Sequence, residues 1–220
     1  MVMQTTKIFG TVIGMDRIEN YEAINKNLLE AVENDINTIN IDTSTEYGFT
    51  TDTSDISEIS DNLQNHEKFA DLFKEITKSL GIFFGKQKYK DADFFITKCW
   101  STYTLKEKYI ATHEHVASHF SFTYYAQKTK HHSPLTFYAP KHRLYLPTCS
   151  EWHENNFESM SFDCDPGTLL VFPSYLFHGT EKLNLTDTPR VSISGDILLT
   201  AKPGVTTESL ITHPSAWRQI

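Results

Sequence analysis

Apolar residues recur at helical spacing in two stretches within the first 90 residues. In the first stretch they fall every three or four positions, which predicts an amphipathic helix with Asp16 as its N-cap. The second stretch follows Asn65 with the same spacing, and Gly81 is placed to end the helix. The polar stretch 42–61 between them predicts a surface loop. The two predicted helical faces consist of Ile18, Tyr21, Ile24, Leu28 and Val32, and of Phe69, Leu72, Phe73, Ile76 and Leu80.

Beyond residue 90 the pattern changes to short runs of β-branched and aromatic residues, separated by prolines. Many short strands without interleaved helices are typical of an antiparallel sandwich or barrel. We therefore predict a single, mainly β domain over residues 1–220. Its helical part, 1–90, would pack on one sheet of a jelly-roll, cupin-like core at 91–200, and 201–220 would form a C-terminal tail. The predicted strands are 93–100, 109–113, 118–126, 135–138, 168–172 and 190–199.

Composition narrows the class of protein. A hydrophobic content of 39% with 22% charged residues is typical of a soluble globular chain, and no apolar run reaches the length of a membrane span. The net charge of −8 disfavours a nucleic-acid partner, which would need clustered positive charge. The three cysteines form no CxxC pair, and the N-terminus lacks the features of a signal peptide. We therefore expect a cytoplasmic protein that binds no membrane.

The first feature with candidate chemistry is His113-Glu114-His115, just before a predicted strand. In an extended segment, residues i and i+2 point to the same face, so both imidazoles could reach one metal ion. Two surface or hydrogen-bonded histidines would have the same spacing. The motif alone therefore leaves both interpretations open.

Two further features follow in the second half of the chain. Residues 165–179 contain a turn and a strongly apolar strand that leads to His178, whose imidazole needs a hydrogen-bond partner or a metal. In the next strand, alternation puts Arg190, Ser192 and Ser194 on one face. A guanidinium and a hydroxyl on an inward face suit a carboxylate ligand. A polar face turned toward water would give the same pattern.

Taken in order, these features resemble the 2-oxoglutarate/Fe(II)-dependent oxygenase superfamily, and most closely its small members from bacteria and phages. The resemblance runs from Cys99-Trp100-Ser101-Thr102 through the HxH motif and a strand with Tyr-Tyr to the stretch 166–194, which is its most specific part. It spans residues 93–199, roughly half of the chain. What it implies is a double-stranded β-helix that holds Fe(II) at its open end.

The same resemblance implies a metal-ligand set. His113 takes the first position and His178 the distal one, and no catalytic residue is implied beyond the ligands. His115 stands where most of the superfamily has Asp or Glu, so the usual facial triad is altered. Three imidazoles still suit a first-row metal ion, although they leave its double charge uncompensated.

The co-substrate implied by the resemblance is 2-oxoglutarate. Arg190 would pair with its distal carboxylate, and Ser192 would donate a hydrogen bond to the same group. Tyr124 or Tyr125, on the strand after the HxH motif, would make a further contact. Alternation does not choose between the two tyrosines.

These assignments predict an Fe(II)- and 2-oxoglutarate-dependent dioxygenase that oxidises an unidentified substrate, with hydroxylation as the first expectation, and releases succinate and CO2. A three-His cupin-like metalloenzyme that does not use 2-oxoglutarate and a non-catalytic jelly-roll binding module remain open as alternatives. The substrate class is a small molecule or a protein side chain, and a homo-oligomer is compatible with the sequence. Loops at 128–133 and 148–161 are expected to cover the entrance of the site.

Overall fold

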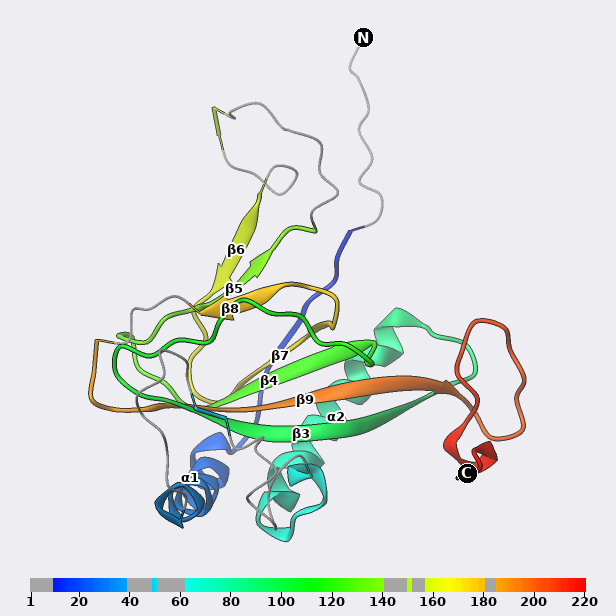
Figure 1. Cartoon of the computed structure of the whole chain (residues 1–220), viewed down its shortest axis with the longest axis horizontal. Coiled ribbons are helices and arrows are strands. Elements are labelled where there is room, and N and C mark those ends of the chain that lie inside the picture. Colours follow the sequence, from blue (N-terminus) through cyan, green and yellow to red (C-terminus); the bar gives the residue numbers. More distant parts are fainter. Residues whose placement is uncertain (1–9, 39–48, 51–61, 141–149, 152–156, 181–184) are drawn as a thin grey trace.

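A computed structural model of the chain describes residues 10–38, 49–50, 62–140, 150–151, 157–180 and 185–220. Nearly all of the surface loop predicted at 42–61, and much of the entrance loop at 148–161, lie outside the described residues. The described chain forms two antiparallel sheets, with the two long helices beneath the larger one (Figure 1).

The larger sheet has the strand order β1-β7-β4-β9-β3-β2, and the smaller sheet, β6-β5-β8, lies above it in Figure 1. Every pair of neighbouring strands is antiparallel. This architecture confirms the predicted mainly β fold with N-terminal helices packed on one sheet. The strands are β1 (Gly14–Arg17), β2 (Phe49–Thr50), β3 (Ala92–Thr104), β4 (Phe120–Gln127), β5 (Leu135–Tyr138), β6 (Ser159–Phe162), β7 (Thr168–Pro173), β8 (His178–Thr180) and β9 (Arg190–Ala201).

Helices α1 (Tyr21–Thr38) and α2 (Ala70–Gln87) cover the outer face of the larger sheet. Short 3₁₀ turns lie at Leu63–Asn65, Glu67–Phe69 and Pro214–Ala216. Among the described helices, none combines the length and the apolar character that crossing a bilayer requires.

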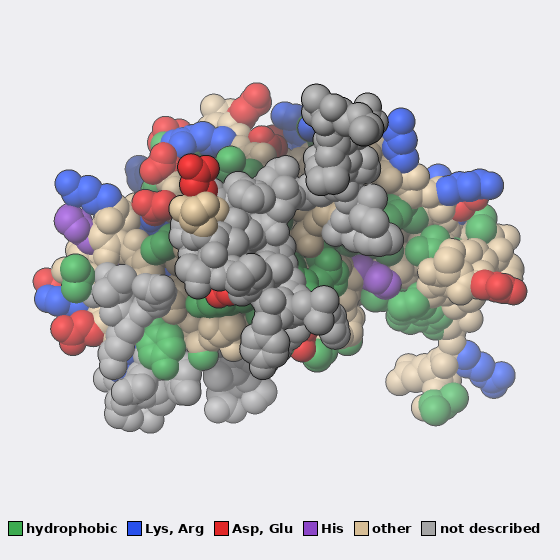
Figure 2. All heavy atoms as spheres, turned by 90° about the horizontal axis from the view of Figure 1, so that it is seen from above, with side chains coloured by type: hydrophobic (Ala, Val, Ile, Leu, Met, Phe, Trp, Pro, Cys, Tyr) green, Lys and Arg blue, Asp and Glu red, His purple; other side chains and the backbone are tan. Residues whose placement is uncertain are grey.

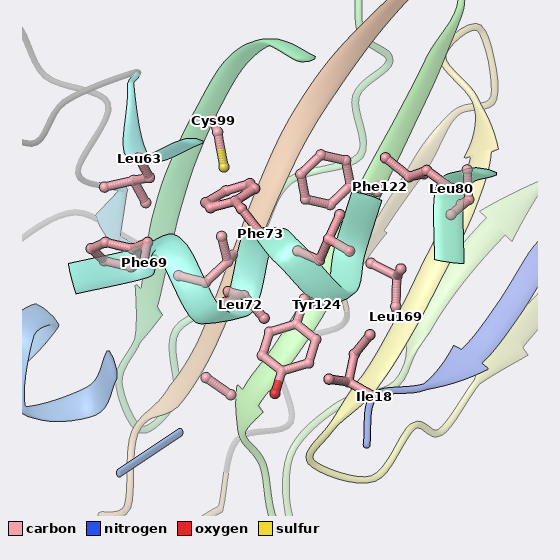
Figure 3. Packing of buried hydrophobic residues seen from close by; sticks show 14 of the residues in the cluster. Ile18, Leu63, Phe69, Leu72, Phe73, Leu80, Cys99, Phe122, Tyr124 and Leu169 are labelled. Carbon is pink, nitrogen blue, oxygen red and sulfur yellow. The ribbon is translucent and has the colours of Figure 1, made fainter. Parts of the chain in front are cut away.

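The main hydrophobic core lies between these helices and the larger sheet. In Figure 3, Leu72 and Phe73 of α2 lie toward Phe122 and Tyr124 of β4, and Phe69 lies beside Leu63. Each of these side chains is almost completely buried, and burial of one such side chain contributes about 1.5–3 kcal/mol. A second, smaller cluster packs between the two sheets and consists of Tyr125, Leu135, Phe137, Cys164, Leu170, Phe172 and Leu176. Strand β4 is therefore buried on both faces.

The predicted ends of both helices are wrong. Asp16 is not an N-cap, because it lies in β1 and accepts a hydrogen bond of 2.6 Å from the Ser79 hydroxyl, and α1 begins only at Tyr21. Gly81 does not end α2, which continues to Gln87 and ends where Lys88 adopts φ +54°. A Cβ added at Gly81 would meet no atom within 4 Å, so this glycine interrupts no packing.

The predicted strand 109–113 is also wrong as a regular strand. Instead, its backbone touches β8 at two separated points: Ile110 exchanges hydrogen bonds with Thr180, and His113 forms an isolated antiparallel bridge with His178. Strands β1, β2, β6 and β8 were not predicted, and with two to four residues they show no period. Strand β5 also has four residues, but it was predicted because prolines at 134 and 140 flank it.

Candidate metal centre

Three histidines converge in the space between the two sheets. His113 and His115 belong to the irregular segment that precedes β4, and His178 is the first residue of β8. The backbone bridge between His113 and His178 brings these distant parts of the chain together. Each histidine offers one ring nitrogen, and the three nitrogens lie within 4.8 Å of one another. A group of this kind could hold one metal ion.

The hydrogen bonds of the rings fix which nitrogen faces the centre. Nδ1 of His113 lies 2.8 Å from the carbonyl of Ala111, and Nδ1 of His178 lies 2.8 Å from the carbonyl of Leu176. A carbonyl can only accept, so both Nδ1 atoms carry the proton and both Nε2 atoms keep a free lone pair. Both rings are thus in the tautomer that binds a metal through Nε2.

Burial keeps two of these ligands neutral. It lowers the pKa of His178 to about 3, with the neighbouring His113 acting in the same direction. Burial also lowers the pKa of His113, partly offset by the hydrogen bond to Ala111. At neutral pH these two imidazoles therefore bind a metal without first losing a proton.

The third ring, that of His115, has different supports. Its Nδ1 lies 2.6 Å from Oδ1 of Asp196 in β9, and the indole of Trp100 in β3 stacks on it with ring centroids 5.4 Å apart. Asp196 was missed as a site residue in the sequence. The sequence nevertheless contained a pattern that points to Asp196, because the alternation that places Arg190, Ser192 and Ser194 on one face of the strand continues to position 196.

An arginine lies in the same cavity as the three histidines. The cavity has a volume of about 370 Å³, and its lining includes Arg190, Ser192, Ser194 and Asp196, as alternation in β9 predicts. Arg190 is only 3% exposed. Its Nη1 and Nη2 make long hydrogen bonds of 3.5 and 3.3 Å to the Ser133 carbonyl and the Thr104 hydroxyl.

The guanidinium of Arg190 has no counter-ion among the residues that the structure describes. Its Nε is buried without a hydrogen-bond partner. Burial lowers the pKa of Arg190, and the hydroxyl of Tyr125 opposes that shift. An arginine nevertheless stays charged in a protein, so this is a desolvated cation that faces a cavity.

The two tyrosines of β4 take opposite sides of the sheet. Tyr125 lines the cavity and interacts with Arg190. The expectation for Tyr124 is corrected, because its side chain lies in the core beneath the sheet and its hydroxyl donates a hydrogen bond of 2.6 Å to Asn25 Oδ1 in α1. Successive residues of a strand point to opposite faces, so only one of the pair could reach the cavity.

These residues fit a metal ion and an anionic ligand bound side by side. Three imidazole nitrogens are donors that iron, zinc, copper and nickel accept. The unpaired guanidinium offers a planar pair of donors to a carboxylate. The donor set and the uncompensated cation line the same cavity.

Part of the chain matches the sequence model of a protein family. Residues 98–196 match the sequence model of a family described as "Putative 2OG-Fe(II) oxygenase". The matched range contains all three histidines, Arg190 and Ser192. This part of the chain is similar to the 2OG-Fe(II) oxygenases, and it covers 99 of the 220 residues.

Solved structures of this enzyme superfamily share the fold. A prolyl-4-hydroxylase from Pseudomonas putida aligns over 88% of this chain and 94% of its own, with 12% identity and a TM-score of 0.53. HygX from Streptomyces hygroscopicus, solved with nickel, 2-oxoglutarate and hygromycin B, aligns over 92% and 93%, with 12% identity and a TM-score of 0.56. A prolyl hydroxylase from Trichoplax adhaerens, in complex with a peptide fragment of hypoxia inducible factor, aligns over 84% and 82%, with 10% identity and a TM-score of 0.54. No curated protein sequence matches the chain.

The remaining described histidines lie apart from the three that converge. The ring of His119 accepts a hydrogen bond from the backbone N–H of Leu199, and His131 lies in the exposed turn predicted as a loop. His132 is buried in that turn, where its two ring nitrogens bond to the backbone of Thr129 and Thr188. Of the three convergent histidines, His115 is the one that departs from the His-x-Asp/Glu pattern usual in the oxygenase superfamily.

Proposed function

We propose that the protein is an Fe(II)- and 2-oxoglutarate-dependent dioxygenase that hydroxylates a C–H bond of its substrate. His113, His115 and His178 would hold the iron, and Arg190 would hold the distal carboxylate of 2-oxoglutarate. In this reaction one atom of O2 enters the substrate and the other enters succinate, while CO2 leaves. The iron supplies the redox chemistry that lets O2 react with 2-oxoglutarate and with the substrate.

The observation that carries this proposal is the buried, unpaired charge of Arg190. Removal of an ion from water costs several kcal/mol even after relaxation, and the guanidinium recovers little of that through its two long hydrogen bonds. A carboxylate at the same point would recover the cost and would accept two parallel hydrogen bonds. A fold that keeps this cation beside three convergent histidines is therefore suited to a ligand with a carboxylate at one end and metal-binding oxygens at the other.

Charge balance also favours 2-oxoglutarate. Three neutral imidazoles leave the double positive charge of the metal in place. Among the described residues that line the cavity, Arg190 and Lys98 add two positive charges and Glu114 and Asp196 add two negative charges, so an excess of two positive charges remains. A dianion lowers this excess by two. Ser192 and Tyr125, which line the cavity with Arg190, would bind the same carboxylate through their hydroxyl groups.

The substrate would enter from a second hollow of about 780 Å³ that adjoins the metal cavity. The two spaces share Glu114, His115 and Val116 as a common wall. Exposed apolar side chains line the outer hollow, and Val116 at the wall is 80% exposed. Figure 2 shows hydrophobic side chains exposed on the face seen from above, to the right of the grey segments.

We infer a substrate with a largely apolar body and no net negative charge. Among the described residues of the outer hollow's wall, Glu114 is the one carboxylate and there is no lysine or arginine, so the wall would repel an anionic substrate. Both a small molecule and a protein side chain fit this description. The relatives offer examples of each, since one is bound to hygromycin B and another to a peptide fragment.

A three-His metalloenzyme that ignores 2-oxoglutarate is the second candidate. Histidine at position 115 favours it, because such a site lacks the usual carboxylate ligand. Arg190 would then bind a carboxylate of the substrate itself. The two candidates differ in whether product formation requires 2-oxoglutarate.

Anaerobic titration of the metal-loaded protein tests the proposal. Addition of Fe(II) and then 2-oxoglutarate should produce the weak visible charge-transfer band of the chelate, and exposure to air should yield succinate. Metal-loaded protein without this band and without succinate would contradict the proposal. Turnover of a substrate with no 2-oxoglutarate present would favour the second candidate instead.

A further inference from the structure

A carboxylate stands directly behind the histidine that replaces the usual carboxylate ligand. Oδ1 of Asp196 lies 2.6 Å from Nδ1 of His115, a short hydrogen bond for an N–H donor and an oxygen acceptor. Asp196 is only 9% exposed, so this contact is shielded from water. Asp196 is not itself among the groups whose ligand atoms converge on the centre.

Strand pairing and a chain of hydroxyl groups hold Asp196 in place. Ser121 of β4 lies opposite Asp196 of β9, and the Ser121 hydroxyl donates to the same Oδ1 atom at 2.9 Å. The hydroxyl of Ser174 lies 2.8 Å from that of Ser121, and the hydroxyl of Ser118 donates to Ser174 at 2.8 Å. Two of these serines, Ser121 and Ser174, are almost fully buried. The carboxylate thus has a fixed position before any metal binds.

The hydrogen bond determines what the His115 ring can do. With Nδ1–H donating to a carboxylate, Nε2 is the free donor atom and its orientation is set. Trp100 stacks on the same ring at an interplanar angle of 24° and restricts its rotation. A carboxylate that is hydrogen-bonded to a ligating imidazole also supports the bond of that imidazole to a cation.

Glu114 lacks this relationship, although it lies next to His115 in the sequence. It lines the same cavity, and it makes no hydrogen bond to any of the three histidines. Asp196 and Glu114 are the two carboxylates in the described lining of the cavity, and only one of them is connected to a candidate ligand. A comparison of substitutions at these two positions therefore separates the effect of a nearby negative charge on the metal site from the effect of the hydrogen bond to His115.

We propose that Asp196 is a positioning residue of the metal site, and that it supplies through His115 the negative charge that the usual triad supplies by direct ligation. The inference rests on the proposed function, because it requires the three histidines to bind a metal. It goes beyond that function by explaining how this chain can lose the carboxylate ligand at position 115 and keep a charge-balanced site.

The test is a titration of the full-length protein with Co²⁺, a probe whose visible spectrum reports the ligand field. Asp196→Asn keeps an acceptor oxygen and removes the charge, and it should weaken Co²⁺ binding by about tenfold. Asp196→Ala removes both, and it should weaken binding by about 100-fold. Both variants should shift the visible bands of the bound Co²⁺, which a loss of folding stability alone would not do.

Two further variants serve as controls. Glu114→Gln removes one charge from the same cavity and should leave the Co²⁺ dissociation constant within about twofold of the wild type and the bands in place. Ser121→Ala keeps the Asp196 charge and loosens its support, so its effect should be smaller than that of Asp196→Asn. Ser121→Ala also keeps the proposal testable if Asp196→Ala fails to fold.

The outcomes separate this inference from the proposed function. If the wild type binds Co²⁺ and both Asp196 variants bind it equally well with unchanged bands, the inference is overturned and the proposed function stands. Equal weakening by Glu114→Gln and Asp196→Asn would also overturn it, since proximity of charge would then suffice. A wild-type protein that binds no Co²⁺ would contradict the metal site itself.

Discussion

The backbones of His113 and His178 are bonded to each other in both directions. The N–H of His113 donates to the carbonyl of His178 at 2.9 Å, and the N–H of His178 donates to the carbonyl of His113 at 2.8 Å. Their rings lie 4.4 Å apart between centroids. The distance between these two candidate ligands is therefore set by strand-like pairing rather than by flexible side chains.

Gly179→Ala should disturb this pairing. A Cβ at Gly179 would lie 2.9 Å from the carbonyl oxygen of Ile110 and 3.0 Å from backbone atoms of Thr112, so the segment leading to His113 would have to move away from β8. We expect metal affinity to fall by about tenfold, as for loss of a supporting contact. Gly85→Ala is the control, because a Cβ there meets no atom and should only stabilise α2, by about 0.5–1 kcal/mol. Unchanged metal affinity in Gly179→Ala would contradict the role of the backbone bridge.

The neighbouring tyrosines of β4 provide a matched pair of substitutions. Tyr125→Phe removes a hydroxyl from the cavity beside Arg190 and should weaken 2-oxoglutarate binding by about three- to tenfold. Tyr124→Phe leaves Asn25 Oδ1 without its donor in the core and should lower the free energy of unfolding by about 1–3 kcal/mol without affecting 2-oxoglutarate. Calorimetric titration and urea unfolding of both variants check this. If Tyr125→Phe lowered the stability and Tyr124→Phe weakened 2-oxoglutarate binding, the assignment of the two faces of β4 would be wrong.

Replacement of Arg190 should separate stability from ligand binding. Arg190→Met removes a buried, unpaired cation, so the ligand-free protein should gain about 1 kcal/mol or more in free energy of unfolding. The same variant should lose at least about 30-fold in affinity for 2-oxoglutarate and keep its affinity for metal. Arg190→Lys keeps the charge, so it should show no such gain in stability, and it binds a carboxylate less well. A less stable Arg190→Met protein would indicate that the arginine is structural.

A carboxylate at position 115 should not restore the usual triad by itself. The Oδ atoms of aspartate and Nδ1 of histidine are both attached to Cγ, so His115→Asp would bring an oxygen close to Asp196 Oδ1, which lies 2.6 Å from Nδ1. Two carboxylates at that distance repel each other. We expect His115→Asp to bind Co²⁺ more weakly than the wild type, and the double variant His115→Asp/Asp196→Asn to recover part of the loss. Additive losses in the double variant would show that the two positions are not coupled.

The metal-free protein should lose stability as the pH falls below about 6.5. Burial lowers the pKa of His178 to about 3 and lowers the pKa of His113 as well. The unfolded chain has a histidine pKa of about 6.5, so between pH 6.5 and the lower folded values it binds more protons than the folded chain. Acid therefore favours unfolding in this pH range, and the full stability is present above pH 6.5. Between pH 6.5 and pH 5, the lowered pKa of His178 alone should reduce the free energy of unfolding by about 2 kcal/mol. Urea unfolding with a chelator present should show that the free energy of unfolding of His178→Gln depends less steeply on pH than that of the wild type. Equal pH dependence of the two proteins would contradict the lowered pKa of His178.

The sequence predicted the parts of the fold that depend on long patterns. Helices of 18 residues and strands such as β4 and β9 have enough turns or alternations to reveal which face is buried. Short pairings do not, which is why the segment 109–113 was taken for a strand and β8 was missed. The backbone bridge that joins His113 to His178 depends on contacts between residues far apart in the sequence, and no local pattern encodes it.

The candidate site divides in the same way. The three histidines, Arg190 and Ser192 were predicted as a set, because the family resemblance and the alternation of β9 point to them. Asp196 is on the same alternating face. Its importance becomes visible only when His115, in the irregular segment before β4 and 81 residues away in the sequence, is seen to bond to it. The choice between Tyr124 and Tyr125 likewise required knowledge of which face of β4 meets the helices.

A crystal structure of the protein with Fe(II) and 2-oxoglutarate, prepared without oxygen, tests the central claim most directly. The account predicts one metal ion bound by ring nitrogens of His113, His115 and His178, with one carboxylate of 2-oxoglutarate on the guanidinium of Arg190. It also predicts that Asp196 stays bonded to Nδ1 of His115 and does not contact the metal. A metal bound elsewhere, or 2-oxoglutarate bound away from Arg190, would contradict the account.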